Sequence, residues 1–406
     1  MGNAMFQRHA RNVFFKNEVM DFFLQWMLGY HSYGGLSIGE GLHIASRIKS
    51  GNIASWEKAF ADFGAAQAEQ ARKLMREGDA AAAGQRHLCS FVVLRASIMF
   101  MSPHAERFGE SIISFEMEFQ EAMKAKELPL EALEIPFEQS SLPAYFCPAK
   151  DAERSRPLIV VIGGADSFRE DLYFFGGAEA IRRGYNALMV DLPGQGKTPA
   201  RGLALRYDTE KPLKAALDWL NANRGLSDAA IGMYGISGGG YFAMRATAYD
   251  KRIRALALST PIYDMYRVIT SMIPKAMTLL SRFLKYIDKV AAVGVEKSLW
   301  QMNVKSYEEV LEKFVNRCSV DIHLVDCPVF AIAGGGEGEE LKRQTRLFYE
   351  EMKKRHRQSI YREYPAETGA DAHCQVNNLV LAHQELLDWF DAVLSPKACL
   401  SPPPQP

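Results

Sequence analysis

A short glycine-rich turn, Gly235-Ile236-Ser237-Gly238-Gly239, most constrains what this chain can fold into. Residues 229–234 before it have the pattern of a buried strand, and residues 241–249 after it have the pattern of a helix. A Gly-x-Ser-x-Gly turn between a strand and a helix is so tight that the serine takes strained backbone angles and its neighbours must lack bulk. That strain presents the hydroxyl above the edge of a sheet, beside the next backbone N–H. The turn therefore predicts that Ser237 is a nucleophile.

The chain after residue 134 has the pattern of an α/β fold. Two short strands open this region, and strands then alternate with helices, which predicts a mostly parallel sheet flanked by helices on both faces. The predicted strands are 134–138, 142–146, 158–162, 187–190, 229–234, 253–258, 329–333 and 359–364, and the predicted helices are 174–183, 212–221, 241–249, 340–353 and 379–394.

The order of these elements divides the chain into five parts. Residues 1–133 carry apolar residues at helical spacing and are predicted to form an N-terminal helical cap domain. Residues 134–261 and 327–396 are the first and second parts of the predicted α/β core. Residues 262–326 interrupt the alternation after the sixth strand and predict a helical cap or lid insertion. The proline-rich residues 397–406 are expected to be a flexible tail.

Aromatic residues and methionines are frequent in the two predicted helical regions. An apolar stripe over residues 272–290 favours a helix packed on the core, and a mobile lid is the other interpretation. Most of these side chains are expected in the core, and some are expected to line a pocket for a flat aromatic substrate. The candidates are Tyr30, Tyr33, Met272, Met277 and Trp300.

Composition argues against several classes of protein. Lysine plus arginine equals aspartate plus glutamate at 48 each, so there is no electrostatic footprint for nucleic acid or an anionic membrane. No apolar run approaches the roughly 20 residues that span a bilayer, and residues 1–11 lack the apolar core of a secretion signal. The six cysteines form no Cys-x-x-Cys pair, which predicts neither a disulfide framework nor a zinc site. We therefore expect a protein of the reducing cytoplasm, with no metal or other cofactor.

A nucleophilic serine needs a histidine that takes its proton. With a serine on a strand-to-helix turn, the acid follows the serine and the histidine comes last in the chain. His373 is the candidate, because it lies in the loop between the last predicted strand and the last predicted helix. Its structural alternative is a loop histidine that caps the final helix. The other histidines beyond Ser237 fit less well, since they precede a strand, lie in a charged stretch or lie within a helix: His323, His356 and His383.

The acid that orients the histidine should lie just past the strand at residues 329–333. Counting from Pro328, which opens that strand, the expected place falls on Glu337, with Glu339 as the second candidate. Asp326 precedes the strand and fits less well. The alternative is that these acids only favour the N-terminus of the next helix through its dipole, which suits Glu339 better than Glu337.

The third requirement is a pair of N–H donors for the oxyanion that forms during acyl transfer. The first donor should be the backbone N–H of Gly238. The second should come from the turn after the strand at residues 158–162, which reads Gly163-Gly164-Ala165-Asp166. Glycines there let the backbone approach the substrate closely, and the donors predicted from this turn are Gly164 and Ala165.

These motifs together resemble the α/β-hydrolase superfamily over about residues 134–395. The motifs that carry the resemblance are Gly163-Gly164, Asp191-x-Pro-Gly-x-Gly, Gly-x-Ser-x-Gly at Ser237, and the late His373. A narrower resemblance covers nearly the whole chain. It is to the group that holds 2,6-dihydroxypseudooxynicotine hydrolase, the fungal yellowish-green pigment hydrolases that shorten polyketides, and the bacterial anthraquinone polyketide-shortening hydrolases. Its markers are residues 33–40, Ser55-Trp56, residues 163–167, and His373-Cys374-Gln375-x-Asn377-Asn378.

The narrower resemblance implies cleavage of a carbon–carbon bond beside a ketone by a retro-Claisen route, under helical cap segments and often in a homodimer. In the pseudooxynicotine enzyme an acidic residue after the paired glycines assists catalysis, and Asp166 occupies the matching place as an aspartate rather than a glutamate. A structural alternative remains open here. Ser167-Phe168-Arg169-Glu170 fits a helix capping box, in which case Asp166 only begins a helix.

The leading functional hypothesis is therefore a serine hydrolase that cleaves a β-diketone or polyketide-like aromatic small molecule at a C–C bond. The second is a carboxylesterase or lactonase with the same triad, since only the leaving group differs. The third is a non-catalytic scaffold that binds other enzymes, and an intact set of Ser237, Glu337 and His373 argues against it.

Overall fold

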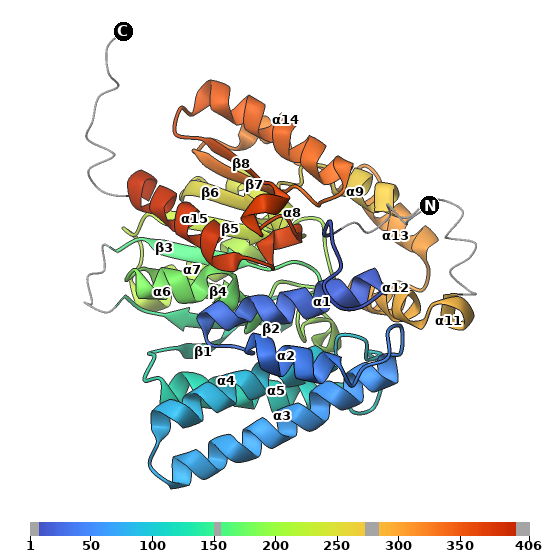
Figure 1. Ribbon diagram of the computed structural model, residues 1–406. Helices are drawn as coiled ribbons and strands as arrows, with labels where there is room; N and C mark the ends of the chain where they lie inside the picture. Colours follow the sequence, from blue (N-terminus) through green and yellow to red (C-terminus); the bar gives the residue numbers. More distant parts are fainter. Residues whose placement is uncertain (1–7, 150–155, 273–283, 395–406) are drawn as a thin grey trace.

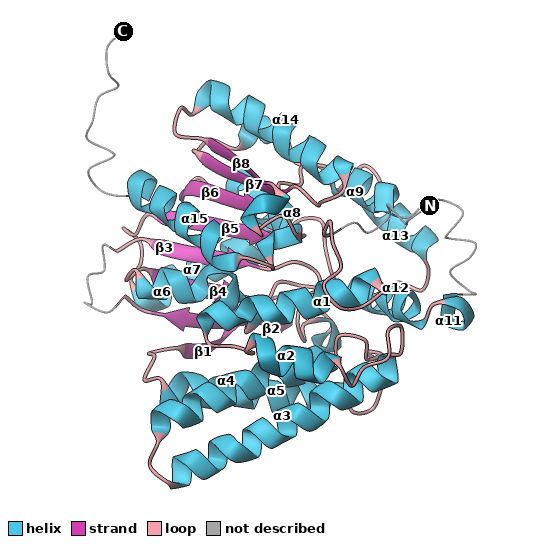
Figure 2. Ribbon diagram, in the orientation of Figure 1, coloured by secondary structure: helices cyan, strands magenta, loops and turns pink. Residues whose placement is uncertain are grey.

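The computed structural model of the chain describes residues 8–149, 156–272 and 284–394. Within these residues one eight-stranded sheet forms the centre, and helices cover both of its faces (Figures 1 and 2). The strands lie side by side in the order β1-β2-β4-β3-β5-β6-β7-β8. Their bounds are β1 Glu131–Phe137, β2 Ser140–Cys147, β3 Leu158–Ile162, β4 Asn186–Val190, β5 Ile231–Ile236, β6 Ile253–Ser259, β7 Val329–Gly334 and β8 Ile360–Tyr364.

The sheet is mostly parallel, as the sequence predicts. The two first strands form an antiparallel hairpin, and β2 pairs with β4 in the antiparallel sense. All pairs from β4 through β8 are parallel. The central strands β3, β4 and β5 are buried along their whole length, which explains why their sequences are continuous apolar runs.

The helices of the core follow the predicted positions with one correction. The helix predicted over 174–183 is regular only in α6, because the turn Tyr173–Gly177 before it is broken by Gly176 at φ +107°. The helices are α6 Ala178–Arg182, α7 Glu210–Arg224, α8 Gly239–Tyr249, α14 Glu339–Arg355 and α15 Leu379–Leu394.

The N-terminal region is helical. Its later helices lie beside the sheet at its β1 end, and its first helix lies across the sheet (Figure 1). Side-chain caps start several of its helices, including a capping box in which the Ser37 hydroxyl and the Glu40 carboxylate satisfy each other's backbone amides. Its helices are α1 Glu18–Gly29, α2 Ile38–Ala45, α3 Ile53–Arg76, α4 Ala80–Ser97 and α5 Phe108–Ala125.

Two apolar cores lie on opposite faces of the sheet, and the alternation of side chains along each strand separates them. On β3, Ile159 and Val161 belong to one core, whereas Val160 and Ile162 belong to the other. The first core also contains α15 and the apolar faces of the N-terminal helices, so the helical region shares a continuous core with the sheet. The fully buried Tyr30 belongs to it.

The insertion after β6 is helical within the described residues. It contains α9 Met265–Met272, α11 Leu284–Ile287, α12 Lys289–Met302 and α13 Tyr307–Phe314. The predicted packing of the stripe on the core holds for Val290, which is buried, and is wrong for Ile287, which is 76% exposed. Residues 273–283, including Met277, and the side chain of Met272 lie outside the described part of the chain.

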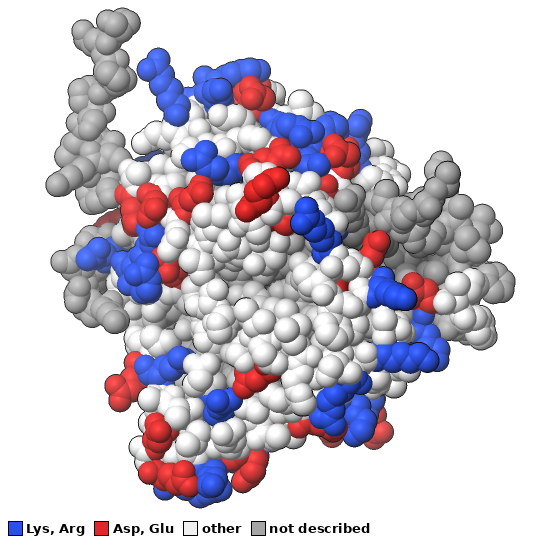
Figure 3. All heavy atoms as spheres, in the orientation of Figure 1, with Lys and Arg blue, Asp and Glu red and all other residues white. Residues whose placement is uncertain are grey.

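Charged side chains of both signs are interspersed on the face drawn in Figure 3, mostly around a central area with few charges. Among the described residues, no helix combines the length and the apolar character that crossing a membrane would require.

The N-terminal strap, residues 8–17, is tied to α1 by one buried carboxylate. Asp21 is fully buried and accepts hydrogen bonds from the backbone amides of Val13 (2.9 Å), Phe14 (2.8 Å) and Phe15 (2.7 Å). Burial alone would raise the pKa of Asp21, but hydrogen bonds from His9 and these amides outweigh it and lower the pKa to about 2.

We expect Asp21→Asn to destabilise the protein by about 3 kcal/mol, because an amide cannot accept from all of these donors. The stabilisation by the ionised carboxylate is present above its unfolded-state pKa of about 3.9 and is lost as pH falls toward 2. Urea unfolding at neutral pH and at stepwise lower pH measures both effects. Asp62→Asn on α3, where the exposed carboxylate pairs with Lys58, is the matched control and should change little. An Asp21→Asn protein as stable as the wild type would contradict this account.

Candidate active site

The predicted turn after β5 is formed, and Ser237 has the strained backbone that such a turn requires. Its φ is +56°, in the left-handed region that non-glycine residues rarely occupy. Side chains at the neighbouring glycines are excluded by space. A Cβ on Gly235 would lie 2.3 Å from the carbonyl oxygen of Gly239, and a Cβ on Gly239 would lie 2.3 Å from that of Ile162. The turn therefore holds the Ser237 hydroxyl at the carboxyl edge of the parallel strands.

The structure brings Ser237, His373 and Glu337 together in one hydrogen-bonded chain. The Ser237 Oγ lies 2.8 Å from His373 Nε2, and His373 Nδ1 is bonded to a carboxylate oxygen of Glu337. Glu337 follows β7 and is 2% exposed. Its carboxylate also accepts from the Thr260 hydroxyl (2.6 Å) and the Gly334 amide (3.0 Å). These bonds fix the carboxylate so that it orients the imidazole.

The other acids considered for this place lie elsewhere. The Glu339 carboxylate is 81% exposed and pairs with Lys342 in the first turn of α14. Asp326 is 72% exposed and lies near His356. Of these three acids, Glu337 is the one that is hydrogen-bonded to His373.

The remaining candidate histidines have other surroundings. His383 is buried within α15, where its Nδ1 lies 2.8 Å from the Tyr33 hydroxyl, and burial lowers its pKa to about 4. His323 is 67% exposed and lies near Glu351.

Electrostatics favour a positive charge on His373. Burial opposes the charged imidazolium, but the adjacent Cys374 and the Glu337 carboxylate outweigh burial and raise the pKa of His373 above its ordinary value. An imidazole that holds a proton strongly can receive one from the serine as the nucleophile attacks.

The predicted oxyanion donors lie beside Ser237. A Cβ on Gly164 would lie 3.0 Å from the Ser237 Oγ and 3.4 Å from the amide nitrogen of Gly238, and a Cβ on Gly238 would lie 3.5 Å from the amide nitrogen of Ala165. Within the described chain, neither the Ala165 amide nor the Gly238 amide donates a backbone hydrogen bond. Both N–H groups are therefore available to a developing oxyanion.

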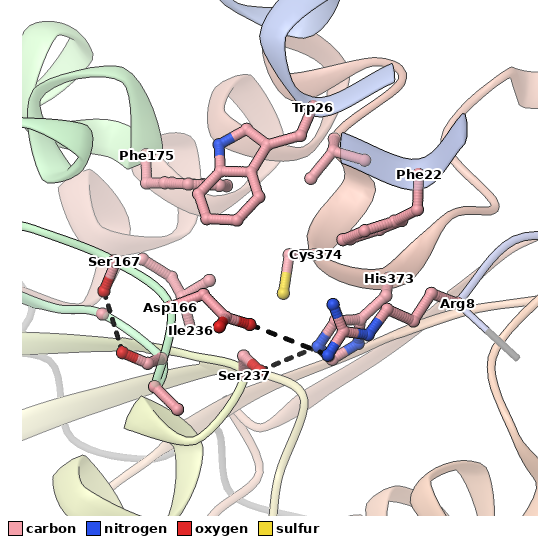
Figure 4. Close-up of a pocket in the computed structure, with 14 residues that line it drawn as sticks. Arg8, Phe22, Trp26, Asp166, Ser167, Phe175, Ile236, Ser237, His373 and Cys374 are labelled. Atoms are coloured by element: carbon pink, nitrogen blue, oxygen red, sulfur yellow. Dashed lines mark hydrogen bonds and ion pairs between the residues drawn. The ribbon is translucent and has the colours of Figure 1, made fainter. Parts of the chain in front are cut away.

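Asp166 lines the same pocket, and its carboxylate lies between Ser237 and the Arg8 guanidinium in the view of Figure 4. Its side chain is 40% exposed, and one carboxylate oxygen lies 3.7 Å from the Arg8 guanidinium.

The capping box predicted just after Asp166 does not form. The Ser167 hydroxyl donates to the Gly164 carbonyl (2.9 Å), and the Phe168 amide is bound by the Asp171 carboxylate (2.9 Å). Asp171 thus takes the capping role that the sequence pattern assigned to its neighbours, and the capping-box interpretation is wrong.

Comparisons with known proteins identify the family to which this chain belongs. The α/β hydrolase gkaG of Penicillium citrinum is 30% identical over 363 residues, which span 80% of this chain and 82% of that protein. The chain belongs to the α/β-hydrolase family. The α/β hydrolase ucsC of Acremonium sp is 31% identical over 274 residues, 61% of this chain but only 55% of that relative's length. A model of the X-Pro dipeptidyl-peptidase (S15) family matches residues 144–273.

The structural similarity to a known protein covers the helical regions of this α/β-hydrolase as well as its sheet. The crystal structure of the 2,6-dihydroxy-pseudo-oxynicotine hydrolase superposes with a TM-score of 0.72 at 18% identity, covering 92% of this chain and 97% of that one. The predicted α/β-hydrolase fold with an N-terminal helical part is confirmed.

The pocket of this α/β-hydrolase is lined largely by residues that the sequence did not single out. Figure 4 shows Phe22, Trp26 and Phe175 surrounding the space above Ser237, with Arg8 beside His373. The free volume is about 30 Å³, room for about one water molecule.

Arg8 reaches the site of this α/β-hydrolase through the N-terminal strap. Its carbonyl accepts from the His373 amide (2.5 Å), and its guanidinium lies over the Phe22 ring, 5.0 Å from the centroid. No motif marks Arg8 in the sequence, because its role depends on a contact across 365 positions that has no period or spacing.

Proposed function

We propose that this α/β-hydrolase uses Ser237 as its nucleophile and cleaves a C–C bond beside a ketone in an aromatic β-diketone or polyketide-like small molecule. The observation that carries the proposal is the Ser237–His373–Glu337 chain in a pocket with aromatic walls and a further carboxylate, Asp166. The resemblance to the group holding 2,6-dihydroxypseudooxynicotine hydrolase supports the choice of a C–C bond.

In the proposed reaction, the Ser237 oxygen attacks a ketone carbonyl while His373 takes the hydroxyl proton. The amides of Ala165 and Gly238 stabilise the resulting oxyanion. The tetrahedral intermediate collapses when its C–C bond breaks, and the electron pair leaves as an enolate stabilised by the second carbonyl. His373 delivers its proton to the leaving carbon. Water then hydrolyses the acyl-enzyme, so that a diketone and one water yield a ketone and a carboxylic acid.

A paired substrate panel tests this function. The purified protein is incubated with p-nitrophenyl esters and with aromatic β-diketones such as benzoylacetone, and products are followed by absorbance and chromatography. Cleavage of the diketone to an acid and a ketone is expected. Rapid ester turnover without any diketone cleavage would favour the carboxylesterase or lactonase alternative. An absence of both activities, with no labelling of Ser237 by a fluorophosphonate, would favour the scaffold.

Asp166 is proposed to assist the C–C step, because its carboxylate lines the same pocket as Ser237 and can act there as a general acid–base group. We expect Asp166→Asn to lower kcat for diketone cleavage about 100-fold and to leave ester hydrolysis within about threefold, since a nitrophenolate leaves without a proton. Steady-state kinetics with both substrates measure the loss of kcat for diketone cleavage and for ester hydrolysis. Equal losses on both substrates would contradict a role in the C–C step.

A further inference from the structure

The oxyanion turn, residues 163–166, is held by hydrogen bonds from side chains to each of its carbonyl oxygens. The Gln195 amide donates to the carbonyls of Gly163 (2.5 Å) and Gly164 (2.9 Å). The Gln301 amide donates to the Ala165 carbonyl (2.5 Å). The guanidinium of Arg95 donates to the Asp166 carbonyl.

These bonds bear directly on where the N–H groups of the turn point. In a trans peptide the C=O and the following N–H point in opposite directions. A donor that holds the Gly164 carbonyl on one side therefore keeps the Ala165 N–H on the other, toward Ser237. Bonds to the Ala165 and Asp166 carbonyls fix the next two peptide planes. They restrain the backbone that follows the Ala165 N–H, so the turn keeps the path that places this N–H beside Ser237.

The donors come from three parts of the chain. Gln195 lies in the core, in the turn after β4. Arg95 lies on α4 of the N-terminal helical region, and Gln301 lies near the end of α12 in the insertion. The sheet alone thus supplies only part of the support for the turn.

Arg95 is buried, and several contacts hold its guanidinium in one position. It is 1% exposed, its Nε donates to the Asp171 carboxylate at 3.0 Å, and its guanidinium lies 4.6 Å from the centroid of the Phe168 ring. A buried arginine with both an ion pair and a ring contact has little freedom, so it presents a fixed donor to the Asp166 carbonyl.

The α12 helix is fixed to the same region by a second contact. The Lys297 ammonium donates to the carbonyls of Ile98 (2.7 Å) and Met99 (2.6 Å), just after α4 ends. Gln301 follows Lys297 by one helical turn, so the docking of α12 on α4 brings its amide to the Ala165 carbonyl.

We propose that Arg95 and Gln301 are positioning residues that complete the oxyanion hole only when both helical regions are docked on the core. The proposal rests on the serine hydrolase function and adds that the helical regions control its rate by holding the part of the turn that follows the Ala165 N–H. They do more than cover the pocket.

Gln301→Met is the first test, because methionine keeps the side-chain length and removes the donor. We expect kcat for ester hydrolysis to fall about tenfold, with KM within about twofold, as part of the donor's contribution is lost. The matched control is Gln384→Met at an exposed position of α15, which should leave both constants unchanged.

Arg95→Lys is the second test, since lysine keeps the charge beside Asp171 but cannot reach the Asp166 carbonyl in the same fork. A further readout compares inhibition by 1,1,1-trifluoro-4-phenylbutan-2-one, whose serine adduct carries an oxyanion, with inhibition by 4-phenylbutan-2-one. We expect either variant to lose about tenfold of the preference for the trifluoromethyl ketone. A residue with a merely structural role would not move this ratio.

Amide hydrogen exchange over residues 163–172 gives a readout that needs no turnover, and it should accelerate in both variants. Wild-type protein that hydrolyses neither substrate would refute the proposed function, and the exchange data together with the inhibitor ratio would still decide the positioning. Folded variants with unchanged kcat, inhibitor ratio and exchange would overturn the proposal. Faster exchange with unchanged kcat and ratio would also overturn it, because the turn would then be held without effect on the oxyanion.

Discussion

Ser237→Ala is expected to lower kcat for both ester and diketone substrates by about 10⁵-fold or more, because no other group can form the acyl-enzyme. The residual rate would come from the oxyanion donors and from substrate binding alone. Labelling by a fluorophosphonate, read by mass spectrometry of the peptide containing residue 237, should disappear in parallel. Ser237 is half-buried and lines the pocket, so we expect the melting temperature to stay within a few degrees of the wild type.

The matched control for this change is Ser298→Ala on α12, where the hydroxyl donates to the Gly294 carbonyl at 2.9 Å. It should retain full activity and labelling. If the Ser237→Ala protein turned over either substrate at the wild-type rate, the serine nucleophile would be wrong.

Glu337→Gln is expected to lower kcat about 10⁴-fold, because the amide no longer stabilises the imidazolium and favours the wrong tautomer of His373. The pH profile gives a second, independent result. His373 must be neutral to accept the serine proton, so kcat/KM falls as pH drops below its pKa. The raised pKa of His373 places this fall in kcat/KM, the acidic limb of the pH profile, above about pH 6.5 in the wild type. Loss of the carboxylate lowers that pKa, so the limb should move to lower pH.

The comparison that decides this prediction is Glu339→Gln, two residues further along the same segment. Its carboxylate is exposed and pairs with Lys342, so kcat and the pH limb should stay as in the wild type. A large loss in Glu339→Gln with little change in Glu337→Gln would show that the acid has been assigned to the wrong residue.

The Ser237 turn was predictable because its requirements are local. The glycines at 235 and 239 are needed where a Cβ would meet backbone atoms, and the apolar runs on each side are the strand and helix that the turn joins. Each strand and helix is likewise indicated by the spacing of apolar residues within its own short segment. The parallel sheet could therefore be predicted strand by strand.

Two local patterns were ambiguous, and the fold resolved them. Glu337 and Glu339 are both acidic and both follow β7, but only Glu337 points inward to His373, where Thr260 also binds it. The capping box after Asp166 was wrong because the Asp171 carboxylate, held by Arg95 from α4, binds the Phe168 amide instead. Helix-capping preferences depend on neighbouring residues. They cannot include Arg95, which holds Asp171 from 76 positions away in the chain.

The sequence by itself determined the α/β sheet, the tight Ser237 turn and the place of the late histidine, because each depends on residues that are neighbours in the chain. Only the tertiary structure decided what surrounds them. Arg8, Trp26, Arg95 and Gln301 come from the strap and the two helical regions, and they meet at residues 163–166 and 237 only after the chain has folded. Their contacts depend on the packing of distant helices against one sheet edge, and such packing leaves no period or spacing in the sequence.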